Sequence, residues 1–222
     1  MIAGVLVILT VAATRTRTVR ITNTPAITWT RPYSVAREPS VTTNEETGFM
    51  SVTVTFSSNG AVRERIAVSE QEFTWQELSS HLLEAGSTGS WSQIQKFGFI
   101  TTESMVDWGD HQSHPKPAFS WDTSGGTYSR AQAKHCTYPG PNNNVGAQTD
   151  YLRHNSHAYR LAIRISGNTV EYLTRNVQND PDADWTVHTK TTATEVDQTK
   201  TYRLVYENTV NTTLYGIRLS VF

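Results

Sequence analysis

The sequence predicts an antiparallel all-β sandwich. Apolar and polar residues alternate along residues 159–166, as expected for a strand with one buried face. Gly167 and Asn168 follow, and a second apolar run begins at Val170. Gly followed by Asn between two such runs is typical of a two-residue hairpin turn, in which the glycine takes a positive φ. A chain of 222 residues fits one large all-β domain or two small ones.

This turn also predicts the register of the hairpin. It sets Ile165 opposite Val170, and both side chains then share the buried face. Arg164 lies opposite Glu171 on the other face, where a cross-strand ion pair is expected. We therefore interpret the hairpin as scaffold and expect specificity in the preceding loops or in the N-terminal segment.

Residues near 75–85 predict the one short amphipathic helix of the chain. Thr74 followed by Glu77 is a capping box, and the apolar residues after it fall on one stripe. Gly86 is placed to end the helix. A short helix in a β protein usually plugs an end of the sandwich or packs on a sheet edge.

Residues 51–68 predict a second hairpin. Both halves alternate, and the Ser-Ser-Asn-Gly segment between them is a turn sequence. A three-residue loop ending in Gly60 sets Val52 against Ile66 and keeps the apolar residues on one face.

Residues 1–40 are predicted to form an arm that precedes a single sandwich domain, residues 41–222. Residues 2–13 are nearly all apolar but too few to span a bilayer as a helix. A buried arm, a signal or membrane anchor, and an ordinary first strand all fit this stretch. Five arginines accompany one glutamate before residue 40, so the segment is also basic. The residues expected to act in assembly are Val5, Leu6, Ile8, Arg15, Arg17 and Arg20.

Residues 107–157 contain few aliphatic residues and predict long loops, which often carry function. Aromatic residues are interspersed there with Asp, His and Asn. Sugar rings stack on aromatic faces while polar groups bind the hydroxyls, so a carbohydrate site is one hypothesis. The alternative is that these aromatics are core or loop anchors. The candidate ligand-binding residues are Trp108, Asp110, His111, Trp121, Tyr128, Asn142, Asn143 and Asn144.

The remaining motifs predict no catalytic residue, no cofactor and no metal site. The acidic and histidine-rich residues 107–114 match no strong zinc or calcium spacing. Residues 180–184 lack the later Gly and Glu of a calcium loop, which favours an acidic turn. Cys136 is the single cysteine, so an intrachain disulfide is excluded. A net charge of -1 gives no general attraction to nucleic acid.

The C-terminal third, residues 159–222, resembles the closing strands of concanavalin A-like lectin or laminin-G-like jelly rolls. The resemblance rests on the Tyr-Arg-Leu-Ala-Ile-Arg-Ile strand, the Gly167-Asn168 turn, Val170-Glu171-Tyr172, Tyr202-Arg203-Leu204 and Ile217-Arg218-Leu219-Ser220. It implies a jelly-roll sandwich, a fold shared by sugar-binding lectins, glucan hydrolases and viral coat or fibre domains. The Glu-x-Asp-x-x-Glu strand of the hydrolases does not occur here, so no catalytic residue is carried over. The apolar and basic arm, together with many Thr and Asn residues, also resembles viral structural proteins.

These observations favour a non-enzymatic structural or assembly protein, a minor capsid, decoration or fibre component of a virion. Its expected partners are other protein subunits, with glycans as a second class and membrane contact through residues 2–13 as a further alternative. The expected location is a virion or an extracellular surface assembly. The alternative function is a carbohydrate-binding module that uses the loops of residues 107–157.

Overall fold

The structure is a computed structural model. It describes residues 27–31, 38–45, 48–54, 66–86, 94–101, 118–122, 128–136, 142–144, 152–153, 159–177, 180, 182–192, 196–208 and 212–221.

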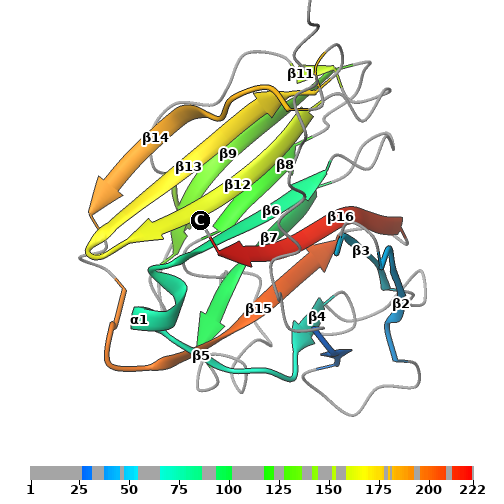
Figure 1. Cartoon of the computed structure of the whole chain (residues 1–222), viewed down its shortest axis with the longest axis horizontal. Coiled ribbons are helices and arrows are strands. Elements are labelled where there is room, and N and C mark those ends of the chain that lie inside the picture. The colour runs from blue at the N-terminus through cyan, green and yellow to red at the C-terminus, as the bar shows by residue number, and fades with distance from the viewer. Residues whose placement is uncertain are drawn as a thin grey trace, which may run out of the picture.

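Two antiparallel sheets make up the fold (Figure 1). The first contains β1 (Trp29–Thr30), β4 (Ile66–Ser69), β5 (Phe73–Thr74), β7 (Ile94–Thr101), β8 (Ala118–Asp122), β9 (Tyr128–Cys136), β10 (Asn142–Asn144), β11 (Leu152–Arg153) and β15 (Thr201–Asn208). The second contains β2 (Ser40–Thr43), β3 (Met50–Val54), β6 (His81–Gly86), β12 (Tyr159–Ser166), β13 (Thr169–Asn176), β14 (Thr186–Thr192) and β16 (Thr212–Val221). We call them the nine-stranded and the seven-stranded sheet, counting described strands. The predicted all-β sandwich is confirmed.

Strand order differs from chain order in both sheets. The nine-stranded sheet runs β1-β4-β15-β7-β8-β9-β10, with β5 beside β15 and β11 beside β9. The seven-stranded sheet runs β14-β13-β12-β6-β16-β3-β2. Strands far apart in the sequence therefore lie side by side, and β6 has β12 on one side and β16 on the other (Figure 1).

The main core is shared by the two sheets. It combines buried residues of the nine-stranded sheet with buried residues of the seven-stranded sheet, among them Phe97, Phe99, Leu204, Tyr206, Val52, Leu83, Leu161, Ile163 and Tyr172. Side chains alternate along a strand, so each sheet also has an outer face. On the seven-stranded sheet a small cluster of Leu82, Ala162 and Leu173 lies apart from the main core, and Trp185 packs against it.

The β12–β13 hairpin has the predicted register. Ile165 pairs with Val170, and both are buried in the main core. Gly167 has a φ of +55°, the positive value that the two-residue turn requires. Arg164 pairs with Glu171 on the opposite face, where their side chains form an ion pair.

The helix is shorter than the sequence predicts. It covers only α1 (Trp75–Leu78), and the capping box of Thr74 and Glu77 is present as expected. Residues 81–85, which the sequence predicts to be helical, lie in strand β6 instead. This strand is buried on both faces, so its apolar residues do not alternate with polar ones, and periodicity does not distinguish it from a helix.

The predicted hairpin of residues 51–68 is wrong. Strands β3 and β4 belong to different sheets: Val52 pairs with Val41, whereas Ile66 pairs with Glu207. In a sandwich the chain can cross between sheets after any strand, and the alternation within a strand does not show which sheet the strand joins.

Part of the predicted N-terminal arm packs on the sandwich. Ile27 and Trp29 belong to the main core, and Arg31 Nη1 donates a hydrogen bond to the carbonyl oxygen of Ile66 at 3.3 Å. In the part of the chain that the structure describes, no helix is long and apolar enough to cross a membrane. The predicted assembly residues lie outside the described residues: Val5, Leu6, Ile8, Arg15, Arg17 and Arg20.

We expect Gly167→Val to lower the free energy of unfolding by about 1–2 kcal/mol, because a branched side chain disfavours the left-handed conformation. A Cβ added at Gly167 would meet no atom within 4 Å, so the loss arises from the backbone rather than from a clash. Gly167→Asn should lose less, since Asn tolerates this conformation. Urea unfolding of both variants measures the difference, and equal losses would contradict this explanation.

Candidate functional site

The residues predicted to bind a ligand lie partly in neighbouring strands. Trp121 is in β8, Tyr128 is in β9, and the three asparagines at 142–144 form β10. The predicted loop region of 107–157 therefore contains four strands, β8 to β11, which its low aliphatic content concealed. Three further candidates lie outside the described residues: Trp108, Asp110 and His111.

The backbone spreads these candidates along β9. Trp121 pairs with Ala131, Asn143 pairs with His135, and Tyr128 begins the strand. Tyr128 and His135 are separated by seven residues in β9, or about 24 Å at 3.4 Å per residue. The structure thus brings the candidates to one sheet but not to one point, and this carbohydrate site stays a prediction.

The acidic segment at residues 180–184 forms a hydrogen-bonded turn. Asp180 Oδ1 accepts a hydrogen bond from the backbone N–H of Asp182 at 2.9 Å, and the Ala183 N–H donates to the Asp180 carbonyl oxygen at 3.1 Å. Among the described residues, no group of three metal-ligating side chains comes together. The other acidic segment, residues 107–114, lies outside them.

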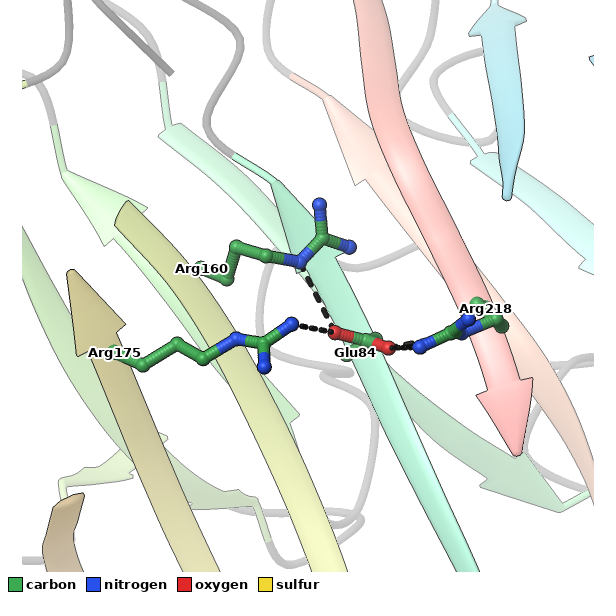
Figure 2. A network of polar contacts seen from close by, with 4 residues as sticks. All are labelled: Glu84, Arg160, Arg175 and Arg218. Atoms are coloured by element: carbon green, nitrogen blue, oxygen red, sulfur yellow. Dashed lines mark hydrogen bonds and ion pairs between the residues drawn. The ribbon is translucent and has the colours of Figure 1, made fainter. Parts of the chain in front are cut away.

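A cluster of charged side chains lies on the outer face of the seven-stranded sheet (Figure 2). Its central residue is Glu84 on β6, whose neighbours Leu83 and Ala85 belong to the main core. Alternation along β6 therefore puts Glu84 on the face opposite that core. Four consecutive strands of the sheet, β13, β12, β6 and β16, supply the members of this Glu84 cluster: Arg175, Arg160, Glu84 and Arg218.

Both carboxylate oxygens of Glu84 accept hydrogen bonds from arginines. Arg218 donates to Oε1 from Nη2 at 2.5 Å and from Nε at 2.9 Å. Arg160 Nε and Arg175 Nη2 donate to Oε2 at 3.0 and 3.5 Å. The Glu84 side chain is only 1% exposed, and hydrogen bonds between charged groups are the strong kind that such burial requires.

Three guanidinium groups around one carboxylate leave the Glu84 cluster with a net positive charge. The pKa of Arg160 lies below its usual value. Burial is the largest cause of this lowered pKa, Glu84 opposes it, and Arg175 and Arg218 lower the pKa further. Arg160 contacts Glu84 through Nε, so its terminal nitrogens point past the carboxylate (Figure 2).

Two aromatic rings contact the cluster. The guanidinium carbons of Arg160 and Arg218 lie 4.2 and 4.0 Å from the ring centroid of Phe49, which directly precedes β3. The guanidinium carbon of Arg175 lies 4.6 Å from the ring centroid of Trp185, which directly precedes β14. These cation–π contacts hold the guanidinium groups next to the aromatic rings.

The sequence analysis missed this cluster because its members are distant in the chain. Glu84 and Arg160 are separated by 76 residues, and Glu84 and Arg218 by 134. One signal was present: Glu84 is the single carboxylate in the apolar run of residues 81–86. A charge in a buried strand needs a partner, and the arginines at outward positions of β12 and β16 were available.

A second group of ion pairs lies on the same face. Glu171 accepts a hydrogen bond from Arg164 Nε at 2.6 Å, and Lys190 Nζ lies 3.2 Å from its other oxygen. Burial raises the pKa of Glu171, but the hydrogen bonds from Arg164 and Lys190 outweigh burial, and the pKa lies below its usual value. A general acid needs a raised pKa, so Glu171 is unsuited to that role.

No family model and no curated protein matches this chain. Solved structures to which the chain is similar include a glycoside hydrolase family protein from Mycobacterium thermorestibile, with a TM-score of 0.33, 10% identity, and coverage of 77% of this chain and 68% of that chain. Another is a glycosyl hydrolase family protein from Mycobacterium fortuitum, with a TM-score of 0.38, 10% identity, and coverage of 86% and 81%. At these TM-scores we transfer no site residue, reaction or substrate.

The names of these two proteins nevertheless contradict two predictions made from the sequence. Both are named as hydrolases, and neither as a virion component. The predicted non-enzymatic virion role, and the prediction that the protein is not an enzyme, are therefore withdrawn. Both depended on a compositional analogy and on missing motifs, and a fold does not determine a function.

We expect Glu84→Gln to lower the free energy of unfolding by about 3 kcal/mol, because three largely buried arginines lose their shared carboxylate. Glu72→Gln is the control, since it removes a more exposed carboxylate, with a side chain 38% exposed, that pairs with Arg203 at 2.8 Å. That variant should lose less than about 1 kcal/mol. Urea unfolding measures the loss of unfolding free energy in both variants. Similar losses would show that the Glu84 cluster stabilises the sheet no more than an exposed ion pair does.

We also expect Glu171 to contribute to the dependence of stability on pH. Its folded-state pKa lies below the ordinary value of 4.5, so its ion pairs stabilise the fold above pH 4.5, and this contribution disappears as the pH falls through the lowered pKa. The stability difference between the wild type and Glu171→Gln should therefore be largest near neutral pH and shrink on acidification. Unfolding midpoints measured across this range test it, and a constant difference would contradict it.

Proposed function

We propose that this protein binds carbohydrate on the outer face of the seven-stranded sheet, at the Glu84 cluster. The observation that carries this proposal is the row of hydrogen-bonding and aromatic side chains that crosses four neighbouring strands between Phe49 and Trp185. Carbohydrate binding is also the alternative function that the sequence suggests, but the site proposed here lies on the other sheet.

This row offers the two kinds of group that sugars need. The C–H faces of a sugar ring pack on aromatic rings, and its hydroxyls accept hydrogen bonds from guanidinium groups, which here are the partly exposed ones of Arg160, Arg175 and Arg218. At one end Phe49 accompanies Arg160 and Arg218, and at the other Trp185 accompanies Arg175. Apolar and polar contacts are thus available together along the row.

The groups are held by strands rather than by loops. Arg218 is directly opposite Glu84 in the β16–β6 pair, and Arg160 is directly opposite Arg175 in the β12–β13 pair. Side chains that are already fixed by ion pairs lose less conformational entropy when a ligand binds. Four strands at about 4.8 Å spacing cover about 14 Å, which suits an oligosaccharide better than a single ring.

Cleavage of a glycosidic bond would need a carboxylic acid that can donate a proton. Glu171 does not provide one, since its pKa is lowered by Arg164 and Lys190. We propose binding, and product analysis in the binding experiment detects any cleavage.

Isothermal titration of the full chain against a panel of neutral and acidic oligosaccharides tests this proposal. We expect at least one of them to bind, and Trp185→Ala to weaken that binding about tenfold, which corresponds to 1.4 kcal/mol. Trp121→Ala, at the site predicted from the sequence, should leave the affinity unchanged.

Phe49→Leu gives a second variant, since it keeps an apolar side chain but removes the ring beside Arg160 and Arg218. Thermal melting checks that each variant is folded. Loss of binding in Trp121→Ala, with Trp185→Ala and Phe49→Leu unaffected, would place the site in residues 107–157 instead. Failure of every oligosaccharide to bind would refute carbohydrate binding.

A further inference from the structure

We propose that the carbohydrate recognised by this face carries a carboxylate, and that Arg175 is the residue that binds it. This inference rests on the proposed function, because it names the chemical class of ligand for the same site. It concerns uronic acids and similar acidic sugars, in which a planar carboxylate is attached to the ring.

The first reason is the unfilled hydrogen-bonding capacity of Arg175. A guanidinium group has five N–H donors. Within the described part of the chain, Arg175 makes one hydrogen bond, a long contact of 3.5 Å from Nη2 to Glu84. Its Nε is buried and has no hydrogen-bond partner there. Buried donors nearly always have partners, so the Arg175 guanidinium is less fully hydrogen-bonded than is usual for a buried group, and its partly exposed side chain can still donate to a ligand.

The second reason is the position of the Arg175 side chain. It is 16% exposed, so a ligand on the sheet face can reach it. Its guanidinium carbon lies 4.6 Å from the ring centroid of Trp185, and this contact restricts the side chain. A fixed guanidinium matches a carboxylate with two parallel hydrogen bonds, and a neutral hydroxyl cannot reproduce that geometry or charge.

The third reason is the charge around Arg175. Glu84 is shared with Arg160 and Arg218, and Arg218 makes the two shorter contacts with it. Arg160 stands directly opposite Arg175 on the neighbouring strand, and like charges in that position repel. A ligand carboxylate would relieve this repulsion and supply the acceptor that Arg175 lacks, whereas a neutral sugar would do neither.

Matched pairs of ligands test the inference. Each pair is one acidic oligosaccharide and its own methyl ester, from a panel of galacturonate, glucuronate, mannuronate and guluronate oligomers. We expect one acid form to bind at least about tenfold more tightly than its ester, since hydrogen bonds to charged groups contribute about 1.5–3 kcal/mol. In Arg175→Gln the ratio of the affinity for the acid to the affinity for its ester should fall to about one.

Two further variants make the assignment specific. Arg175→Lys keeps the positive charge but removes the planar guanidinium group, which can donate two parallel hydrogen bonds to one carboxylate. This variant should lose most of the preference for the acid. Arg203→Gln removes one guanidinium from the nine-stranded sheet, where it pairs with Glu72, and should keep the full preference. Thermal melting confirms that the variants are folded.

The outcomes separate this inference from the proposed function. Equal affinity for every acid and its ester would overturn the inference while leaving carbohydrate binding intact, and absence of binding to all ligands would overturn both. Polyglutamate is a carboxylate polymer without sugar rings. If it binds as tightly as the best acidic oligosaccharide, binding depends on negative charge and not on the sugar, and the inference is overturned. A preference that survives in both Arg175 variants would overturn the role of Arg175.

Discussion

Strand β6 is the element on which the rest of the seven-stranded sheet depends. It lies between β12 and β16, and both of its faces are covered. Leu83 and Ala85 must fit the main core on one face, while Glu84 must find charged partners on the other. A carboxylate that is 1% exposed is costly unless it is paired. The surrounding arginines meet this requirement and link four strands through side chains as well as through the backbone.

The features that depend on neighbouring residues can be predicted from the sequence. The two-residue turn at Gly167 and Asn168 determines every pair of the β12–β13 hairpin, because a turn of fixed length leaves only one register. The capping box of Thr74 and Glu77 forms as expected, since its hydrogen bonds join residues three positions apart. Together with the all-β class, these local features account for the correct part of the prediction.

The features that depend on strand order cannot be predicted in this way. The run of residues 81–86 is apolar enough for a buried helix or a buried strand, and only its position between β12 and β16 decides for the strand. The Glu84 cluster needs the same information, since no local rule brings β6, β12, β13 and β16 together. The aromatic residues of 107–157 lie close together in the sequence, which therefore predicts a ligand site there. The members of the Glu84 cluster come together only in the folded protein.

Stability alone does not account for the composition of the Glu84 cluster. Arg218 already donates two hydrogen bonds to Glu84, and one guanidinium is enough to neutralise one carboxylate. Replacing a buried ion cluster with apolar side chains is often neutral or stabilising. Burial is the largest cause of the lowered pKa of Arg160, and the other two arginines lower it further, while Arg175 Nε is buried without a partner among the described residues. Both effects are unfavourable in the free protein, so the cluster is not arranged for stability alone.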